Sequence, residues 1–117
     1  MNLTYTTEID DFTICFRLSG KIISELDYVE LEKEVFVHLN KNYIRVIFNL
    51  DNLTHTNSSG ISFFMRTLTK SRIMGGELIL VGLNGNVEKI FSIAKLDEVY
   101  TIFQNENEAI NHFKELQ

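Results

Sequence analysis

The sequence predicts a single α/β domain over residues 1–117, with a mostly parallel sheet of four or five strands and four helices. A length of 117 residues suits one domain, and the absence of proline leaves no proline-rich linker to separate modules. Apolar residues make up 44% of the chain and include nine Phe, which is enough for a core. Segments with the period of a strand alternate with segments with the period of a helix, and this alternation is typical of parallel sheets with crossover helices.

The N-terminal segment predicts an antiparallel hairpin. Residues 3–8 have a weak strand pattern, and Asp10-Asp11 predicts a turn. In the second strand, apolar residues alternate with more polar ones, which predicts one buried face: Phe12, Ile14, Phe16 and Leu18. Cys15 then lies on the more polar face. We expect an inert, half-buried thiol there, because no cation or helix N-terminus adjoins it in sequence.

Helix starts and stops set the remaining elements. Ser24 with Asp27 three residues later forms a capping-box pattern and predicts a first helix that ends near residues 40–42. Asn105 and Glu108 predict the same kind of start for the last helix. Between them we expect strands over 44–50, 77–83 and 99–103, and helices over 61–72, closed by Gly75-Gly76, and 87–94. The predicted order is β-β-α-β-α-β-α-β-α.

Composition and charge exclude several function classes. The net charge is −5 and no basic run occurs, so direct binding to nucleic acid is not expected. No apolar run approaches the roughly 20 residues that span a bilayer, and the first residues lack the pattern of a secretory signal. The single Cys15 cannot form an internal disulfide, which fits a reducing compartment. We therefore expect a cytoplasmic protein without membrane insertion.

Catalytic and metal-binding patterns are not found in the sequence. His38 and His112 fall on predicted helices as surface residues, and no histidine has a Cys or carboxylate at metal-ligand spacing. Residues 82–85 lack the Walker lysine and the dinucleotide glycine pattern. Ser58 is not in a Gly-x-Ser-x-Gly elbow. The sequence therefore predicts no cofactor, no metal and no catalytic residue, and an enzyme is the least favoured class.

The polar stretch 54–60 is the most informative segment. It follows a predicted buried strand and begins a helix, a place where binding sites form in open α/β sheets. Asn57 and Ser58 are good N-cap residues, and the helix dipole there favours an anion such as a phosphate on Ser58. His55 lies in the predicted loop and could line a partner-facing site. Two alternatives without a binding function stay open. Residues 57–60 are only the start of a helix, and His55 is a loop histidine without a role.

Phe63 belongs to an apolar cluster at the start of the second predicted helix, together with Phe64 and Met65. Most of this cluster is expected in the core. Because its members cannot all point inward, Phe63 is a candidate for an exposed contact patch, with burial in the core as the alternative.

Three stretches in register resemble the STAS family, the sulphate transporter and anti-sigma factor antagonist domains. Its members have a strand leading to Asp-Ser-Ser/Thr-Gly-Leu, a helix, a Gly-Gly-x-Leu strand and a Val-x-x-x-Phe-x-x-x-x-Leu helix. The resemblance covers nearly the whole chain, and the matching stretches are Val46–Leu53 with Asn57–Ile61, Gly75–Val81, and Val87–Leu96 running into Val99-Tyr100. It implies a compact STAS-like fold.

The resemblance also implies a switch residue. In phosphorylatable antagonists, the serine after the motif aspartate receives phosphate from a kinase anti-sigma factor, and here that residue is Ser58. Ser59 and Gly60 match the next two positions. Two departures remove acidic residues: Asn57 replaces the motif aspartate, and the segment 20–23 reads Gly-Lys-Ile-Ile where the family often has Gly-x-Leu-Asp.

The main functional hypothesis is therefore a non-catalytic regulatory module for protein–protein interaction. By resemblance it is an anti-sigma factor antagonist that binds an anti-sigma factor of the serine kinase type and thereby frees a sigma factor. The alternative is a STAS subunit of a larger assembly, such as a lipid-transport complex or a stress-signalling scaffold, without a phosphorylation cycle. The oligomeric state stays open. The predicted contact surface joins the first helix to the following residues: His55, Asn57, Ser58, Ser59, Gly60 and Phe63.

Overall fold

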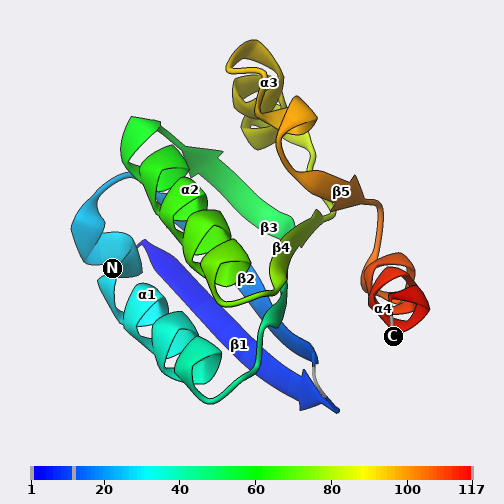
Figure 1. The fold of residues 1–117 in the computed structure, drawn as a ribbon. Helices are drawn as coiled ribbons and strands as arrows, with labels where there is room; N and C mark the ends of the chain where they lie inside the picture. The colour runs from blue at the N-terminus through cyan, green and yellow to red at the C-terminus, as the bar shows by residue number, and fades with distance from the viewer. Residues whose placement is uncertain (1, 12, 117) are drawn as a thin grey trace.

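The computed structural model describes residues 2–11 and 13–116, and it confirms the predicted order of strands and helices (Figure 1). Phe12, which the sequence placed in the second strand, lies outside the described residues. A short 3-10 helix, η1, precedes the last strand. The elements are β1 Leu3–Asp10, β2 Thr13–Ile22, α1 Glu25–Asn40, β3 Arg45–Thr56, α2 Ser58–Ile73, β4 Glu77–Val81, α3 Gly85–Ile93, η1 Leu96–Glu98, β5 Thr101–Phe103 and α4 Glu106–Glu115.

The five strands form one sheet in the order β1-β2-β3-β4-β5. β1 and β2 pair antiparallel as the predicted hairpin, and the other three pairs are parallel. Each parallel pair is joined through a helix, because neighbouring parallel strands need a long crossover. The prediction of a mostly parallel sheet of four or five strands with four helices is therefore confirmed.

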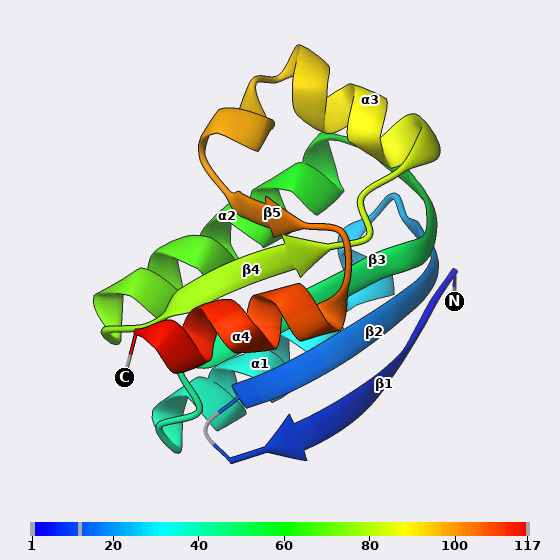
Figure 2. The same ribbon diagram turned by 90° about the vertical axis from the view of Figure 1, so that its right-hand side faces the viewer.

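Helices cover both faces of the sheet. α1 and α2 lie on one face and α4 lies on the other, as the two views show (Figure 2). The side chains of β3 alternate between these layers. Phe48 packs against Phe63 and Phe64 of α2, whereas Ile47 belongs to the smaller apolar cluster that includes Phe113 of α4. This double burial explains the continuous apolar run in β3.

The face of β2 that the sequence marked as polar is covered rather than exposed. Cys15 is only 6% exposed and clusters with Ala109 and Phe113 of α4. Burial raises the pKa of the Cys15 thiol to about 12, with the Glu106 carboxylate adding to the effect. The thiol is thus more deeply buried than predicted. The strand period could not reveal this cover, because α4 lies at the far end of the sequence.

β3 is longer than the predicted strand over 44–50. After two irregularities its pairing with β2 resumes, and Lys21 lies opposite His55 while Ile22 lies opposite Thr56. The expectation that His55 lies in a loop is therefore wrong. Because threonine favours extended backbone, residues 54–56 continue β3 at its C-terminal end. Only Asn57 then separates β3 from α2.

Two other strands are shorter than predicted. β4 ends at Val81 because Gly82 takes a positive φ of 72°, which breaks the extended run. β5 begins at Thr101 because the backbone N–H groups of Val99 and Tyr100 still donate to the Leu96 carbonyl oxygen at the end of η1. His38 and His112 also differ from the surface positions expected: both are half-buried, and their rings lie beside Phe16 and Phe103. Among the described residues, no helix is both long enough and apolar enough to cross a membrane.

Candidate functional site

The start of α2 is organised by the side chain of Asn57. Its Oδ1 accepts hydrogen bonds from the backbone N–H groups of Ser59 at 3.0 Å and Gly60 at 3.4 Å. Its Nδ2 donates to the carbonyl oxygen of Ile23 at 2.9 Å. Asn57 therefore caps α2 and also ties it to the segment between β2 and α1, as a carboxylate without a donor could not do.

The start of α1 is held by the Asp27 carboxylate. It accepts hydrogen bonds from the backbone N–H groups of Asn2, Ile23 and Ser24, at 3.0 to 3.2 Å. These bonds lower the pKa of Asp27, the Ile23 amide contributing most. The predicted pairing of Ser24 with Asp27 is confirmed. Ile23 thus links the first turns of α1 and α2, and its own side chain is 44% exposed.

Ser58 is the first residue of α2 and is exposed, while Ser59 is half-buried. Within the described part of the chain, no hydrogen bond involves the Ser58 hydroxyl. His55 is exposed near the end of β3, and its Nδ1 lies 2.9 Å from the Thr54 hydroxyl oxygen. Ser58 is therefore presented to solvent at the start of α2.

Gly60 lies beneath this surface and packs against the end of β3. A Cβ at this position would lie 1.9 Å from Thr56 Oγ1 and 3.0 Å from Ile22 Cγ2, so only glycine fits. Thr56 is itself 7% exposed, and its hydroxyl has no hydrogen-bond partner among the described residues. Gly60 therefore does not contact a partner directly. It allows α2 to pack closely against the ends of β2 and β3.

The prediction that Phe63 contributes to an exposed contact patch is wrong. Its side chain is fully buried, with its ring stacked on Tyr28 of α1 at 4.7 Å and on Phe48 of β3 at 5.8 Å. The physical reason is that α1 covers this side of α2. The helical period of α2 alone did not show which of its sides α1 would cover.

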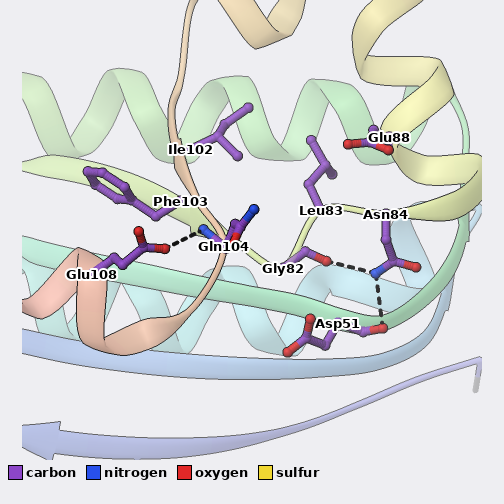
Figure 3. Close-up of a pocket in the computed structure, with 9 residues that line it drawn as sticks. All are labelled: Asp51, Gly82, Leu83, Asn84, Glu88, Ile102, Phe103, Gln104 and Glu108. Carbon is purple, nitrogen blue, oxygen red and sulfur yellow. Dashed lines mark hydrogen bonds between the residues drawn. The ribbon is translucent and has the colours of Figure 1, made fainter.

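The structure also contains a hollow that the sequence did not indicate. It measures 630 Å³ and lies where β4 and β5 end and α3 and α4 begin (Figure 3). Asn84 Nδ2 donates to the carbonyl oxygens of Gly82 at 2.7 Å and Asp51 at 3.3 Å. Three carboxylates line the hollow, so it does not suit a phosphate ligand. The lining residues are Asp51, Gly82, Leu83, Asn84, Glu88, Ile102, Phe103, Gln104 and Glu108.

Beneath α4, a polar cluster joins three strands to that helix. Arg17 donates to both carboxylate oxygens of Glu106 at 2.8 Å and to Glu8 at 2.8 Å, and Asn49 Nδ2 donates to Glu106 at 2.6 Å. These bonds, with Arg17 first, lower the pKa of Glu106 to about 2. In the described residues, no three His, Cys, Asp or Glu side chains converge as metal ligands.

The family profile of the STAS domain matches residues 4–109. The chain therefore belongs to the STAS domain family, as its three motifs indicated. This assignment rests on nearly the whole described fold, from β1 to α4.

Relatives with related sequences are named as candidate anti-sigma factor antagonists. The chain is similar to BtrV of Bordetella bronchiseptica, with 24% identity over 93 residues that cover 80% of each protein. It is also similar to a homologue of the protein TM1081 in Thermotoga neapolitana, with 29% identity over 72 residues, 62% of this chain and 64% of that protein.

Solved structures of similar proteins share the fold. The unphosphorylated form of the anti-sigma factor antagonist SpoIIAA superposes with a TM-score of 0.83 at 19% identity, covering 95% of this chain and 96% of that one. The phosphorylated form of SpoIIAA from Bacillus gives a TM-score of 0.76 at 19% identity, covering 94% and 99%. The crystal structure of TM1081 of Thermotoga maritima gives 0.81 at 24% identity, covering 92% of each chain.

Proposed function

We propose that this protein is a regulatory protein–protein interaction module that acts as an anti-sigma factor antagonist. Its partner is an anti-sigma factor of the serine kinase type, and binding frees a sigma factor and so activates transcription indirectly. One observation carries the proposal. The Ser58 hydroxyl is presented to solvent at the first residue of α2, at the position that receives phosphate in the antagonists this chain resembles.

The local geometry supports phosphorylation of Ser58 without loss of the fold. A phosphate adds about −1.5 to −2 charges at neutral pH. At the first turn of a helix this charge interacts favourably with the dipole, by about 0.3–1 kcal/mol. Asn57 holds the amides of Ser59 and Gly60, so α2 is capped before any phosphate arrives. We expect the phosphorylated domain to stay folded and to lose its partner, because a buried unpaired charge costs several kcal/mol at an interface.

Near Ser58, this chain has uncharged side chains at two positions where the family often has an acidic residue. These positions, Ile23 and Asn57, touch through the hydrogen bond from Asn57 Nδ2 to the Ile23 carbonyl oxygen. The neutral pair removes repulsion against a phosphate on Ser58. It also favours a second candidate function, a STAS subunit of a larger assembly such as a lipid-transport complex or a stress-signalling scaffold, since a kinase that needs the aspartate would not recognise this site.

The contact surface follows from exposure. His55, Asn57 and Ser58 are exposed and Ser59 is partly so, and Ile23 extends the same surface towards α1. We propose that this surface binds the partner in the cytoplasm and that the domain itself catalyses no reaction. The nearest histidine in the sequence, His55, contacts the Thr54 hydroxyl.

The test begins with affinity purification of the protein from its native cell and identification of its partner by mass spectrometry. The purified partner is then incubated with the domain and ATP, and phosphopeptides are mapped. We expect phosphate on Ser58, its loss in Ser58→Ala and its retention in the matched variant Ser59→Ala. Phosphate on Ser59 alone, or none with an active cognate kinase, would refute the switch and favour the constitutive subunit.

Restoring the acids tests how the kinase recognises the site. The double variant Ile23→Asp, Asn57→Asp returns the family's charges to the surface beside Ser58. If the cognate kinase is adapted to the neutral pair, the double variant should be phosphorylated more slowly than the natural protein. Equal rates would show that neither position takes part in recognition.

A further inference from the structure

Two large aliphatic side chains are exposed at the start of α1. Ile23 directly precedes the cap residue Ser24 and is 44% exposed, and Leu26, the second residue of α1, is 74% exposed. Acidic side chains stabilise the first turn of a helix, whereas an exposed leucine there contacts little of its own protein. We call these two side chains the apolar pair. Adjacent exposed aliphatic groups of this kind are typical of a surface that contacts another molecule.

The apolar pair lies beside the proposed phosphate acceptor. Asn57 Nδ2 donates to the Ile23 carbonyl oxygen at 2.9 Å, so Ile23 adjoins the residue directly before Ser58. The first turns of α1 and α2 lie side by side, because Tyr28 of α1 stacks on Phe63 of α2 with 4.7 Å between the ring centroids. The apolar pair and Ser58 therefore belong to one surface at the start of both helices.

Ile23 is fixed by hydrogen bonds on both sides of its backbone. Its N–H donates to Asp27 Oδ2 at 3.0 Å, and its carbonyl oxygen accepts the bond from Asn57. The Asp27 carboxylate is itself buried and also accepts from the backbone N–H groups of Asn2 and Ser24. A side chain that projects from such a fixed backbone loses little conformational freedom when a partner covers it, which favours affinity.

The neighbouring part of α2 carries no charged side chain. Residues 56–65 contain no Asp, Glu, Lys or Arg, and Ser58 and Ser62 are the exposed residues of the first two turns of α2. On either side of Ile23 in the chain, the nearest exposed charges are Lys21 and Glu25, which have opposite signs. The surface around the apolar pair thus offers a partner aliphatic and hydroxyl groups and little net charge.

We propose that Ile23 and Leu26 anchor the partner at the Ser58 surface and that the partner receives them in an uncharged, apolar pocket. Position 23 is one of the two at which this chain lacks the acid common in the family. An acid there suits a basic side chain of a partner, whereas isoleucine suits an apolar one. This proposal rests on the proposed function, because its occupant is the anti-sigma factor bound at that surface.

The anchor also gives a physical reason for release of the partner. A phosphate on Ser58 would stand at the rim of an apolar contact, beside residues 56–65, which include no Lys or Arg. A charge that is pressed against an apolar surface without a basic partner is costly, so the phosphorylated domain and the anti-sigma factor separate.

Matched variants of exposed aliphatic residues test the anchor. The probe is each anti-sigma factor of the serine kinase type encoded in the same genome, produced without its sigma factor and titrated with the domain in a calorimeter. Ile23→Ser and Leu26→Ser should each weaken binding at least about tenfold, and Leu26→Met, which keeps an apolar side chain, should restore it.

Two controls have the same exposure as the apolar pair but lie elsewhere. Ile73 is 74% exposed, like Leu26, and lies at the far end of α2, about 22 Å from Ser58 along the helix. Val37 is 49% exposed, close to the value for Ile23, and lies in the last turn of α1. Ile73→Ser and Val37→Ser should change the affinity less than about twofold. All variants should keep the circular dichroism spectrum of the natural protein.

Salt dependence distinguishes an apolar anchor from an ionic one. Between about 0.05 M and about 0.5 M NaCl, the affinity of the natural domain should change less than about twofold, because screening acts on charges. Ile23→Asp restores the family's acid and should weaken binding at every salt concentration. A natural affinity that falls tenfold or more over this range would refute an uncharged pocket.

The outcomes separate the anchor from the proposed function. Natural affinity in Ile23→Ser and Leu26→Ser, with binding lost in Ser58→Glu, would overturn the anchor and leave the proposed function standing. Binding that depends on Leu26 without any phosphorylation of Ser58 would support the anchor and refute the switch. If no anti-sigma factor of the kinase type binds the natural domain, the proposed function fails and the anchor fails with it. A dimer in sedimentation equilibrium that dissociates on Leu26→Ser would show that a second copy covers the apolar pair instead.

Discussion

Gly60 offers a direct test of how α2 is seated on the sheet. Replacing it with alanine adds a Cβ that would lie 1.9 Å from Thr56 Oγ1, 3.0 Å from Ile22 Cγ2 and 3.2 Å from the Ile22 carbonyl oxygen. The first distance is far inside van der Waals contact, and Thr56 is too buried to move freely. We therefore expect Gly60→Ala to destabilise the domain, although alanine is the better helix former.

The size of the effect follows from two opposing contributions. Overpacking a close contact costs about 1–3 kcal/mol. Replacing glycine by alanine inside a helix stabilises by about 0.5–1 kcal/mol. The net loss in the free energy of unfolding should be about 1–2 kcal/mol. Most of that loss is assigned to a single atom, Thr56 Oγ1, so the second variant Thr56→Ala should relieve it.

The assay is a double-mutant cycle on urea unfolding of the natural domain, Gly60→Ala, Thr56→Ala and the double variant. We expect a favourable coupling of about 1–2 kcal/mol between the two sites, since the double variant lacks the colliding oxygen. The cycle needs equal slopes of free energy against urea in all four proteins. Natural stability for Gly60→Ala, or strictly additive losses, would show that Thr56 rotates aside and would refute this reasoning.

Three further predictions concern groups that are buried or half-buried. Glu106→Gln should lower the free energy of unfolding by about 1–2 kcal/mol at neutral pH. Because the pKa of Glu106 is lowered from 4.5 to about 2, this difference from the natural protein should be complete above pH 4.5 and disappear as the pH falls towards 2. A difference in the free energy of unfolding that stays constant down to pH 2 would count against it. Phe63→Ala should cost about 3–5 kcal/mol in chemical denaturation, and a stable variant that only loses partner binding would contradict the burial described above. Cys15 should react with Ellman's reagent only as fast as the domain unfolds, and rapid labelling of the folded protein would rule out the covered, high-pKa thiol.

Local pattern was sufficient wherever a structural feature depends on neighbours in the chain. The alternation of strand and helix periods predicted the order of elements and the mostly parallel sheet. The caps at Ser24, Asn57 and Asn105 were readable because a cap joins residues only two or three positions apart. The place of Ser58 at the start of a helix was predictable for the same reason, since it follows directly from where the cap places the first turn.

Tertiary structure alone decided what lies above each side chain. Phe63 is covered by Tyr28 of α1, and Cys15 is covered by Phe113 of α4, which is almost the full length of the chain away. Periodicity shows that a residue faces one side of its element, but whether that side meets solvent depends on the packing of distant elements. The bond from Asn57 to Ile23 across 34 residues has the same origin. It exists because the sheet brings the ends of β2 and β3 together.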